Sequence, residues 1–192
     1  MGCQNMKNMK KLTIINGSYR KNGFTIAALE AEAERLIEKY DMMATFYHLD
    51  DDLVACRFCD TCVMGCRFKD QFQELFEAIK DSDRVMFGSP VYLDFPSPKL
   101  LAFLSRLGFC TEKDDRKAIA GKKAHIVACG YCSGTKTVVH TLMGAIEMCG
   151  FDIEGRSTKE YISLWKDGKV RGGMKRGDES WIPQESLKKL RP

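Results

Sequence analysis

Short apolar runs alternate with segments of helical periodicity along most of this 192-residue chain. The first run, residues 11–16 (Lys-Leu-Thr-Ile-Ile-Asn), is rich in β-branched residues and ends at Gly17, which indicates a buried strand. A loop that contains glycines follows over residues 17–23, and apolar residues then recur at helical spacing from Ile26 to about Tyr40. A strand followed by a glycine-containing loop and a helix is typical of an α/β domain.

The same alternation continues toward residue 157. Strands are predicted at residues 43–49, 84–88, 123–129 and 151–157, and helices at residues 72–79, 99–106 and 136–148. Strands that alternate with helices predict a parallel sheet covered on both faces. Beyond Gly155 the pattern weakens, so we predict one domain. Its parts are a leader at residues 1–10, the domain at residues 11–158, which includes a cysteine loop at residues 56–66, and a basic C-terminal extension of the same domain at residues 159–192.

The composition excludes several classes of protein. Hydrophobic residues make up 44% of the chain and charged residues 29%, as in globular rather than disordered proteins. No stretch approaches the roughly 18 consecutive apolar residues of a membrane span, and residues 1–11 lack the apolar run of a secretory signal. We therefore expect a cytoplasmic protein without a membrane partner. The net charge of +4 comes from the extension, which lacks interleaved aromatic residues, so we expect no nucleic-acid partner.

The loop after the first predicted strand has the composition of an anion-binding loop. Residues 17–25 read Gly-Ser-Tyr-Arg-Lys-Asn-Gly-Phe-Thr, which places hydroxyl groups, an arginine and glycines at the start of a helix, where backbone N–H groups can bind a phosphate. The loop matches neither the dinucleotide motif GxGxxG nor the P-loop motif GxxxxGK[ST]. For this segment alone, an ordinary turn from strand to helix is the alternative.

Two further loops are expected beside it, because open parallel sheets bind ligands at the carboxyl ends of their strands. Residues 88–98 (Gly-Ser-Pro-Val-Tyr-Leu-Asp-Phe-Pro-Ser-Pro) combine a restricted backbone with two aromatic residues, which suits a wall for a flat ring. Residues 129–135 (Cys-Gly-Tyr-Cys-Ser-Gly-Thr) offer small residues and hydroxyl groups where a ligand approaches the backbone.

Together these segments resemble the NAD(P)H-dependent FMN reductase superfamily, whose members carry a GS-x-R-x-x-G-x-T phosphate loop and an SPVY segment over the flavin. The resemblance covers about residues 11–155. It implies a flavodoxin-like, doubly wound α/β fold with a five-stranded parallel sheet in the order 2-1-3-4-5 and helices on both faces. It implies FMN as the cofactor, with the phosphate held by Ser18, Arg20, Asn22, Phe24 and Thr25, the ring flanked by Ser89, Pro90, Val91 and Tyr92, and the other side closed by Gly130, Tyr131, Cys132 and Ser133.

One position departs from the superfamily pattern. Many relatives have asparagine where Phe24 stands, so a backbone N–H must replace a side-chain contact to the phosphate there. No catalytic acid or base is predicted, because the flavin supplies the chemistry.

The most specific motif is Cys56-x-x-Cys59-x-x-Cys62-x-x-x-Cys66, which places four thiols within eleven residues. Nine cysteines in a chain without an export signal favour metal or redox chemistry over disulfides. Three closely spaced thiols in one loop can bind three corners of a 4Fe–4S cluster, which a fourth cysteine completes. Structural zinc usually splits its ligands into two separate CxxC pairs. We therefore predict a 4Fe–4S cluster, with zinc, redox-active thiols and unligated cysteines as alternatives.

The position of this motif agrees with a subfamily. Iron–sulfur flavoproteins combine the FMN domain with a compact CxxCxxC…C loop between the second strand and the second helix, and this sequence resembles one. The last gap of the motif is at or just below the short end of that subfamily's usual spacing, so Cys110 and Cys132 are alternative fourth ligands. The three histidines share no ligand spacing and are expected in packing or surface roles: His48, His125 and His140.

The predicted function combines both groups. FMN exchanges a hydride or single electrons, whereas a cluster transfers one electron at a time. The resemblance thus implies an FMN-dependent oxidoreductase that passes electrons between a reduced donor, ferredoxin or NAD(P)H, and a small-molecule acceptor. It also implies a homodimer or homotetramer with the flavin site at the interface. Arg57, Arg67 and Lys69 flank the cysteines and are expected to favour the reduced cluster and an acidic electron carrier.

Two other functions stay open. One is an NAD(P)H-dependent FMN or quinone reductase without a cluster, in which the cysteines are idle or form redox pairs. The other is a zinc-stabilised binding module without redox activity.

Overall fold

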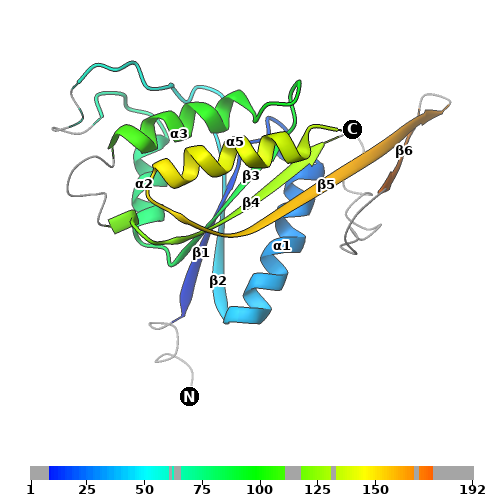
Figure 1. The fold of residues 1–192 in the computed structure, drawn as a ribbon, viewed down its shortest axis with the longest axis horizontal. Coiled ribbons are helices and arrows are strands. Elements are labelled where there is room, and N and C mark those ends of the chain that lie inside the picture. The colour runs from blue at the N-terminus through cyan, green and yellow to red at the C-terminus, as the bar shows by residue number, and fades with distance from the viewer. Residues whose placement is uncertain are drawn as a thin grey trace.

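The computed structural model describes residues 9–60, 62, 66–110, 118–130, 133–166 and 169–174, with side chains up to residue 158. Every predicted strand and helix is present, and the helix predicted at residues 99–106 continues to Cys110 (Figure 1). In chain order the elements are β1 (Lys10–Asn16), α1 (Phe24–Tyr40), β2 (Met42–His48), α2 (Phe72–Lys80), β3 (Arg84–Pro90), α3 (Pro98–Cys110), β4 (Lys123–Gly130), α5 (Thr135–Met148), β5 (Asp152–Lys166) and β6 (Lys169–Met174).

The sheet has the predicted topology. Its strands lie in the order β2-β1-β3-β4-β5-β6, and every pair from β2 through β5 is parallel. The order 2-1-3-4-5 of the five parallel strands is therefore confirmed. It brings the carboxyl ends of β1, β3 and β4 to the same edge of the sheet, where the three predicted loops begin.

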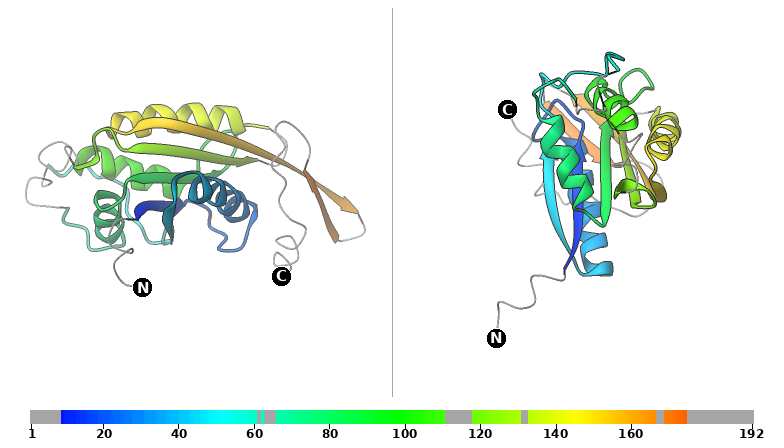
Figure 2. Two further views of the ribbon diagram at one scale, coloured as in Figure 1. Left: turned by 90° about the horizontal axis from the view of Figure 1, so that it is seen from below. Right: turned by 90° about the vertical axis from the view of Figure 1, so that its left-hand side faces the viewer.

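Side chains alternate between two cores, one on each face of the sheet. Ile14 and Met86 pack with α1 on one face, whereas Ile15 and Phe87 pack with α2, α3 and α5 on the other. All four side chains are fully buried, which explains why these strands read as continuous apolar runs. Figure 2 (left) shows α1 and α5 on opposite sides of the central strands.

The fifth strand is longer than predicted. β5 extends past residue 157 to Lys166, and β6 returns antiparallel to it, with Lys166 opposite Lys169. The two residues between these strands are Asp167-Gly168, a pair typical of two-residue hairpins, so the sequence contains a local signal for this hairpin although no apolar run marks it. The hairpin projects away from the helices (Figure 1). Residues 1–8 and 175–192 lie outside the described residues, and the predicted division at residue 158 stays a prediction.

None of the helices in the described part of the chain combines the length and hydropathy that a membrane crossing requires.

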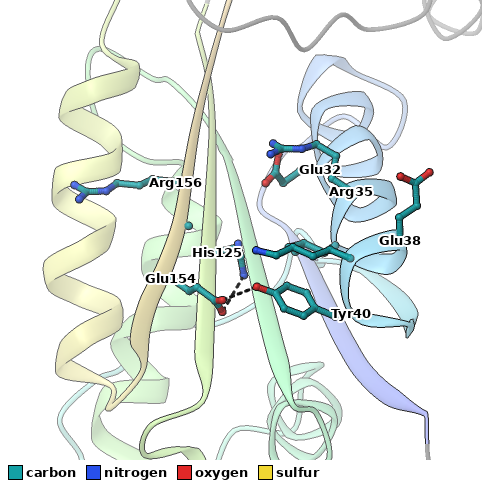
Figure 3. Close-up of a pocket in the computed structure, with 10 residues that line it drawn as sticks. Glu32, Arg35, Glu38, Tyr40, His125, Glu154 and Arg156 are labelled. Atoms are coloured by element: carbon teal, nitrogen blue, oxygen red, sulfur yellow. Dashed lines mark hydrogen bonds and ion pairs between the residues drawn. The ribbon is translucent and has the colours of Figure 1, made fainter.

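A bulge between β4 and β5 places a buried histidine against a glycine. The register shifts after Ala124, so that His125 lies opposite Gly155 and Glu154 is the extra residue. A Cβ atom at Gly155 would lie 2.4 Å from Nδ1 of His125, which leaves no room for a side chain. The hydroxyl of Tyr40 donates a hydrogen bond of 2.7 Å to Glu154. These residues line a cavity of about 670 Å³ between α1 and β5, away from the predicted loops (Figure 3).

Burial, reinforced by the charges of Arg84 and Lys39, lowers the pKa of His125 to about 4. The carboxylate of Glu154 also lies close, 3.7 Å from Nε2, but it forms an ion pair with Arg84. His125 is therefore neutral in the folded protein at neutral pH and does not serve as a counter-ion.

We expect acid to destabilise the fold through His125. Below the unfolded pKa of 6.5 the unfolded chain binds a proton that folded His125 does not, so stability falls as the pH drops from 6.5 to about 4. Over this window the free energy of unfolding of the wild type, measured by urea titration, should fall relative to His125→Gln by on the order of 3 kcal/mol. Carboxylates titrate in both proteins and cancel. If the difference in free energy of unfolding between the wild type and His125→Gln does not change with pH, the low pKa of His125 would be contradicted.

Candidate functional site

The three predicted loops begin side by side at the edge of the sheet. The N–H of Gly17, the first residue after β1, donates a hydrogen bond of 2.8 Å to the carbonyl of Gly88 in β3. The N–H of Val91, the first residue after β3, donates one of 2.8 Å to the carbonyl of Cys129 in β4. The predicted convergence of these loops is confirmed.

Asn16, the last residue of β1, organises the first loop. Its side chain is fully buried, and its Oδ1 accepts a hydrogen bond of 3.0 Å from the N–H of Ser18. Its Nδ2 lies 2.9 Å from Nδ1 of His48, at the end of β2. Burial, with nearby lysines, lowers the pKa of His48, so the ring is neutral and Nδ1 can accept from the amide. Sequence reasoning did not identify Asn16 or the role of His48, because their contact joins two strands.

The loop then leads into the N-terminus of α1, which has no side-chain cap among the described residues. The hydroxyl of Ser18 accepts a hydrogen bond of 3.1 Å from the N–H of Arg20, which holds the turn. In the described structure no side chain caps α1 at Gly23, and no acidic residue lies in its first turn. Thr25 is buried here, whereas Arg20 and Asn22 are exposed. Such a helix start attracts anions through the helix dipole, as the predicted phosphate site requires.

The second loop contains a tight turn. Tyr92 and Phe95 exchange backbone hydrogen bonds of 2.9 Å in both directions. Both central residues are left-handed, with φ of 48° at Leu93 and 66° at Asp94, as in a type I′ turn. A left-handed leucine is strained, and its side chain is 95% exposed. The turn thus holds apolar groups at the mouth of the site rather than in the core.

Residues 89–92, which are predicted to flank the flavin ring, are held by a hydrogen bond at the base of the loop. A tyrosine of the first loop lies beside them, which was not predicted. Ser89 is fully buried, and its hydroxyl accepts a hydrogen bond of 2.9 Å from the N–H of Ser97, which closes the base of the loop. Above it, the rings of Tyr92 and Tyr19 meet edge to face with centroids 6.2 Å apart. Both rings are nearly half exposed, so they offer aromatic surface to a ligand.

The third loop packs against the second. Gly134 is left-handed, with φ of 81°, and a Cβ atom there would lie 2.1 Å from Oδ1 of Asp94. A Cβ atom at Gly130 would lie 2.7 Å from the carbonyl of Ser133, so the chain folds back closely on itself. Tyr131 and Cys132 lie outside the described residues. The described members of the predicted FMN site are thus brought together, and their individual contacts to FMN stay predictions.

A second site collects the cysteines of the motif and adds a fifth thiol from α3. We call it the thiol cavity, and its free volume is about 10 Å³. The fifth thiol, Cys110, lies at the end of α3, and the sequence indicated it only as an alternative fourth ligand. The residues that line the cavity are Cys56, Arg57, Cys59, Cys62, Cys66, Phe68, Arg106, Phe109 and Cys110.

The backbone of the cysteine loop is turned sharply on both sides of Cys59. Phe58 and Asp60 are left-handed, with φ of 50° and 53°. Such conformations cost energy and persist where the surroundings enforce them. The ring of Phe58 meets Phe109 of α3 edge to face, with centroids 4.5 Å apart. Helix α3 therefore supports the strained part of the loop.

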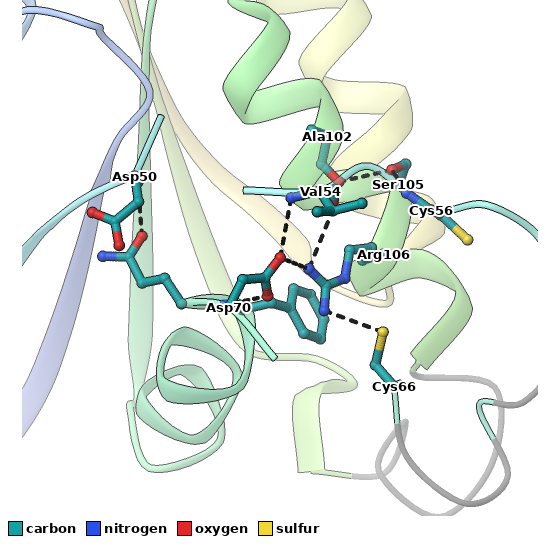
Figure 4. Close-up of polar contacts among 10 residues, drawn as sticks. Asp50, Val54, Cys56, Cys66, Asp70, Ala102, Ser105 and Arg106 are labelled. Carbon is teal, nitrogen blue, oxygen red and sulfur yellow. Dashed lines mark hydrogen bonds and ion pairs between the residues drawn. The ribbon is translucent and has the colours of Figure 1, made fainter. Parts of the chain in front are cut away.

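Helix α3 also holds both ends of the loop. The N–H of Cys56 donates a hydrogen bond of 3.1 Å to the hydroxyl of Ser105. At the other end, Nη2 of Arg106 donates one of 3.1 Å to Sγ of Cys66 (Figure 4). Neighbouring residues of one helix thus position the first and last thiols of the motif.

Asp70, two residues before α2, forms an ion pair with Arg106 and so completes this arrangement. Burial raises the pKa of Asp70, but hydrogen bonds from the N–H of Val54, at 3.0 Å, and from Arg106 outweigh it, and the pKa is lowered overall. Asp70 is therefore ionised at neutral pH. Arg106 itself is 1% exposed, and its Nε has no hydrogen-bond partner among the described residues.

The chemistry of the cavity fits a sulfur-bound iron group. Burial raises the pKa of Cys62, and burial together with Cys62 and Cys66 raises that of Cys110 to about 12. In the described part of the chain, no three potential ligand side chains stand at metal-binding separations. Loading with metal would therefore displace protons and rearrange the thiols. The cysteine ligands of the cavity are nevertheless all sulfur. Arg106 lines the same cavity, and its buried Nε has no hydrogen-bond partner among the described residues.

Two known proteins match part of this chain. An iron-sulfur flavoprotein of Archaeoglobus fulgidus is 36% identical over 84 residues, which cover 43% of this chain and 41% of that protein. A second iron-sulfur flavoprotein of the same organism is 28% identical over 95 residues, 48% of each chain. The matches thus span less than half of these relatives.

A solved structure shares the fold. The crystal structure of RosB with bound 8-demethyl-8-formylriboflavin-5′-phosphate superimposes with a TM-score of 0.65 at 20% identity, over 85% of this chain and 68% of that one.

The NADPH-dependent FMN reductase family matches residues 10–153, which contain the first four parallel strands, the start of β5 and all three loops. The chain therefore belongs to the NADPH-dependent FMN reductase family.

Proposed function

We propose that this protein is an FMN-dependent oxidoreductase and an iron–sulfur flavoprotein. It binds FMN at the three converging loops and a 4Fe–4S cluster in the thiol cavity, and it passes electrons between a reduced donor and a small-molecule acceptor. NAD(P)H or ferredoxin is the proposed donor. The similarity to two iron-sulfur flavoproteins supports the proposal, which needs both groups in one chain.

The observation that carries the proposal is that one helix borders both sites. At the start of α3, Nζ of Lys99 lies 4.4 Å from the ring centroid of Tyr19, in the flavin loops. Seven residues later, Arg106 lines the thiol cavity. At 1.5 Å per residue these two positions are about 10 Å apart along the helix. The two sites are therefore neighbours on a rigid support.

When bound, FMN exchanges the two electrons of a hydride for two single electrons, and a cluster carries them one at a time. The chain's own part is to bind and orient these groups. Ser18, Arg20 and the start of α1 would bind the phosphate, and Tyr92 would flank the ring. Cys56, Cys59, Cys62 and Cys66 would hold the iron.

The rival function is a flavin reductase without a cluster. Two observations favour it: the thiol cavity has a free volume of only about 10 Å³, and no three described ligands converge on a point. In that case the five thiols would act as a redox-active or purely structural group. Metal analysis separates the two functions.

We also propose that the protein forms a homo-oligomer and that it is located in the cytoplasm. Leu93 and Phe95 are 95% and 61% exposed at the mouth of the flavin site, where a second copy of the chain would cover them. Free thiols persist in the reducing cytosol.

FMN binding should depend on Arg20. We expect Arg20→Gln to weaken FMN about tenfold, because it removes a charge-assisted hydrogen bond to the phosphate. The neighbouring exposed cation provides a matched control, and Lys21→Gln should change the affinity far less. Quenching of flavin fluorescence on titration with each apoprotein measures the affinity. Equal affinity in the two variants would remove Arg20 from the phosphate site.

The iron content should depend on the cysteine motif. After anaerobic reconstitution with iron and sulfide, we expect about four irons per chain in the wild type. Serine at any one of Cys56, Cys59, Cys62 or Cys66 should lower this number sharply. Cys110→Ser and the control Cys149→Ala, buried in the core between α3 and α5, should retain it.

The outcomes of this experiment are distinct. Loss of iron in Cys110→Ser but not in Cys66→Ser would move the fourth ligand to α3. A wild type that takes up zinc but no iron, or neither metal, would contradict the cluster and favour the rival function.

Electron delivery by an acidic carrier should depend on the basic residues around the cavity. Arg57 and Lys69 are exposed beside the thiols. The double variant Arg57→Glu/Lys69→Glu should slow reduction by reduced ferredoxin about tenfold at low ionic strength and weaken its salt dependence. The control is Arg35→Glu, which reverses the charge of an exposed residue on α1. Stopped-flow kinetics that are the same in both proteins would rule out docking at this surface.

A further inference from the structure

We propose that Arg106 is a positioning residue for the iron–sulfur site, which fixes Cys66 for metal binding and offers its Nε to a sulfur atom of the bound group. This inference rests on the proposed function. Neither the motif nor the family comparison points to this arginine, which lies on α3, 40 residues beyond Cys66.

The first argument is that two of the three guanidinium nitrogen atoms of Arg106 donate hydrogen bonds within the described structure and one does not. Nη2 donates to Sγ of Cys66 at 3.1 Å, and Nη1 donates to the carbonyl of Val54 at 3.3 Å and to Asp70 (Figure 4). Only Nε is left without a partner among the described residues, although Arg106 is 1% exposed. A buried N–H without an acceptor is costly, and a sulfur atom in the cavity that Arg106 lines would relieve that cost.

The second argument is the rigidity of the guanidinium. It lies over the ring of Phe72 at 4.2 Å from the centroid, and its pairing with Asp70 compensates its charge. Asp70 in turn accepts a hydrogen bond of 3.2 Å from the N–H of Phe72 at the start of α2. The donors that face sulfur are therefore fixed in direction before any metal binds.

The third argument is the position of its partners in the sequence. Val54 precedes the cysteine motif by two residues, and Asp70 follows it by four. One guanidinium therefore joins the two ends of the loop that carries the thiols. Its geometry sets how closely the first and last cysteines approach each other, which a surface cation could not do.

Hydrogen bonds to cluster sulfur raise the reduction potential, and outer contacts to metal ligands secure metal affinity. A lysine at position 106 would keep the charge beside Asp70 but lose the planar set of donors. The substitution Arg106→Lys therefore separates positioning by hydrogen bonds from a simple effect of charge.

The test uses the full-length protein after anaerobic reconstitution with iron and sulfide. We expect Arg106→Lys to keep its FMN content but to lose iron to a chelator about 10- to 100-fold faster than the wild type. Its cluster midpoint potential, followed by electron paramagnetic resonance, should be more negative. Arg35→Gln removes an exposed charge on α1, which does not line the thiol cavity, and should change both readouts little.

A second variant guards against misfolding. Because removal of Arg106 alone leaves Asp70 buried and unpaired, Arg106→Gln is combined with Asp70→Asn, which removes both charges. It should show the same fast iron loss and the same direction of potential shift.

The outcomes separate this inference from the proposed function. Iron loss and potential in Arg106→Lys and in the double variant that equal those of the wild type would overturn the role of Arg106 while leaving the cluster in place. A wild-type chain that retains FMN but binds no iron would overturn the proposed cluster, and this inference with it.

Discussion

Two buried cations on α3 tie the functional loops to the core. Lys99 and Arg106 are 6% and 1% exposed, and a charge at such depth is tolerated only when it is paired and hydrogen-bonded. Lys99 forms an ion pair with Asp51 and donates a hydrogen bond of 2.8 Å to the carbonyl of Leu49, both in the segment after β2. Arg106 contacts Val54 and Asp70, which lie on either side of the cysteine motif. The need to compensate these charges therefore attaches two irregular segments to one regular helix.

This attachment places the two candidate sites on a common support. The apolar face of α3, with Leu100, Phe103 and Leu107 fully buried, is held in the core on one face of the sheet. Its start borders the flavin loops, and its end carries Cys110 into the thiol cavity. Large relative motion between the sites would expose buried charge, so we infer that their separation is preserved. Such a fixed separation suits electron exchange between two bound groups.

Much of the candidate site was readable from local sequence. The loops around Ser18 and Ser89 and the thiols of the motif are contiguous segments, so their composition and spacing carried the signal. Asn16 and Arg106 carried none, because each acts on residues that are distant in sequence or hidden in a strand or helix pattern. The hairpin of β5 and β6 is a different case: Asp167-Gly168 was a usable local signal among polar residues.

The strand order was implied by the family resemblance. The sequence pattern alone predicted the parallel sheet, because buried strands must be continuously apolar and each crossover helix must cover a face. It also determined where thiols and small loop residues occur along the chain. Only the tertiary structure decided that Cys110 joins the thiols of the motif and that one arginine joins both ends of their loop. The physical reason is that these contacts arise from the compensation of buried polar groups, which depends on where the packed core brings distant segments together.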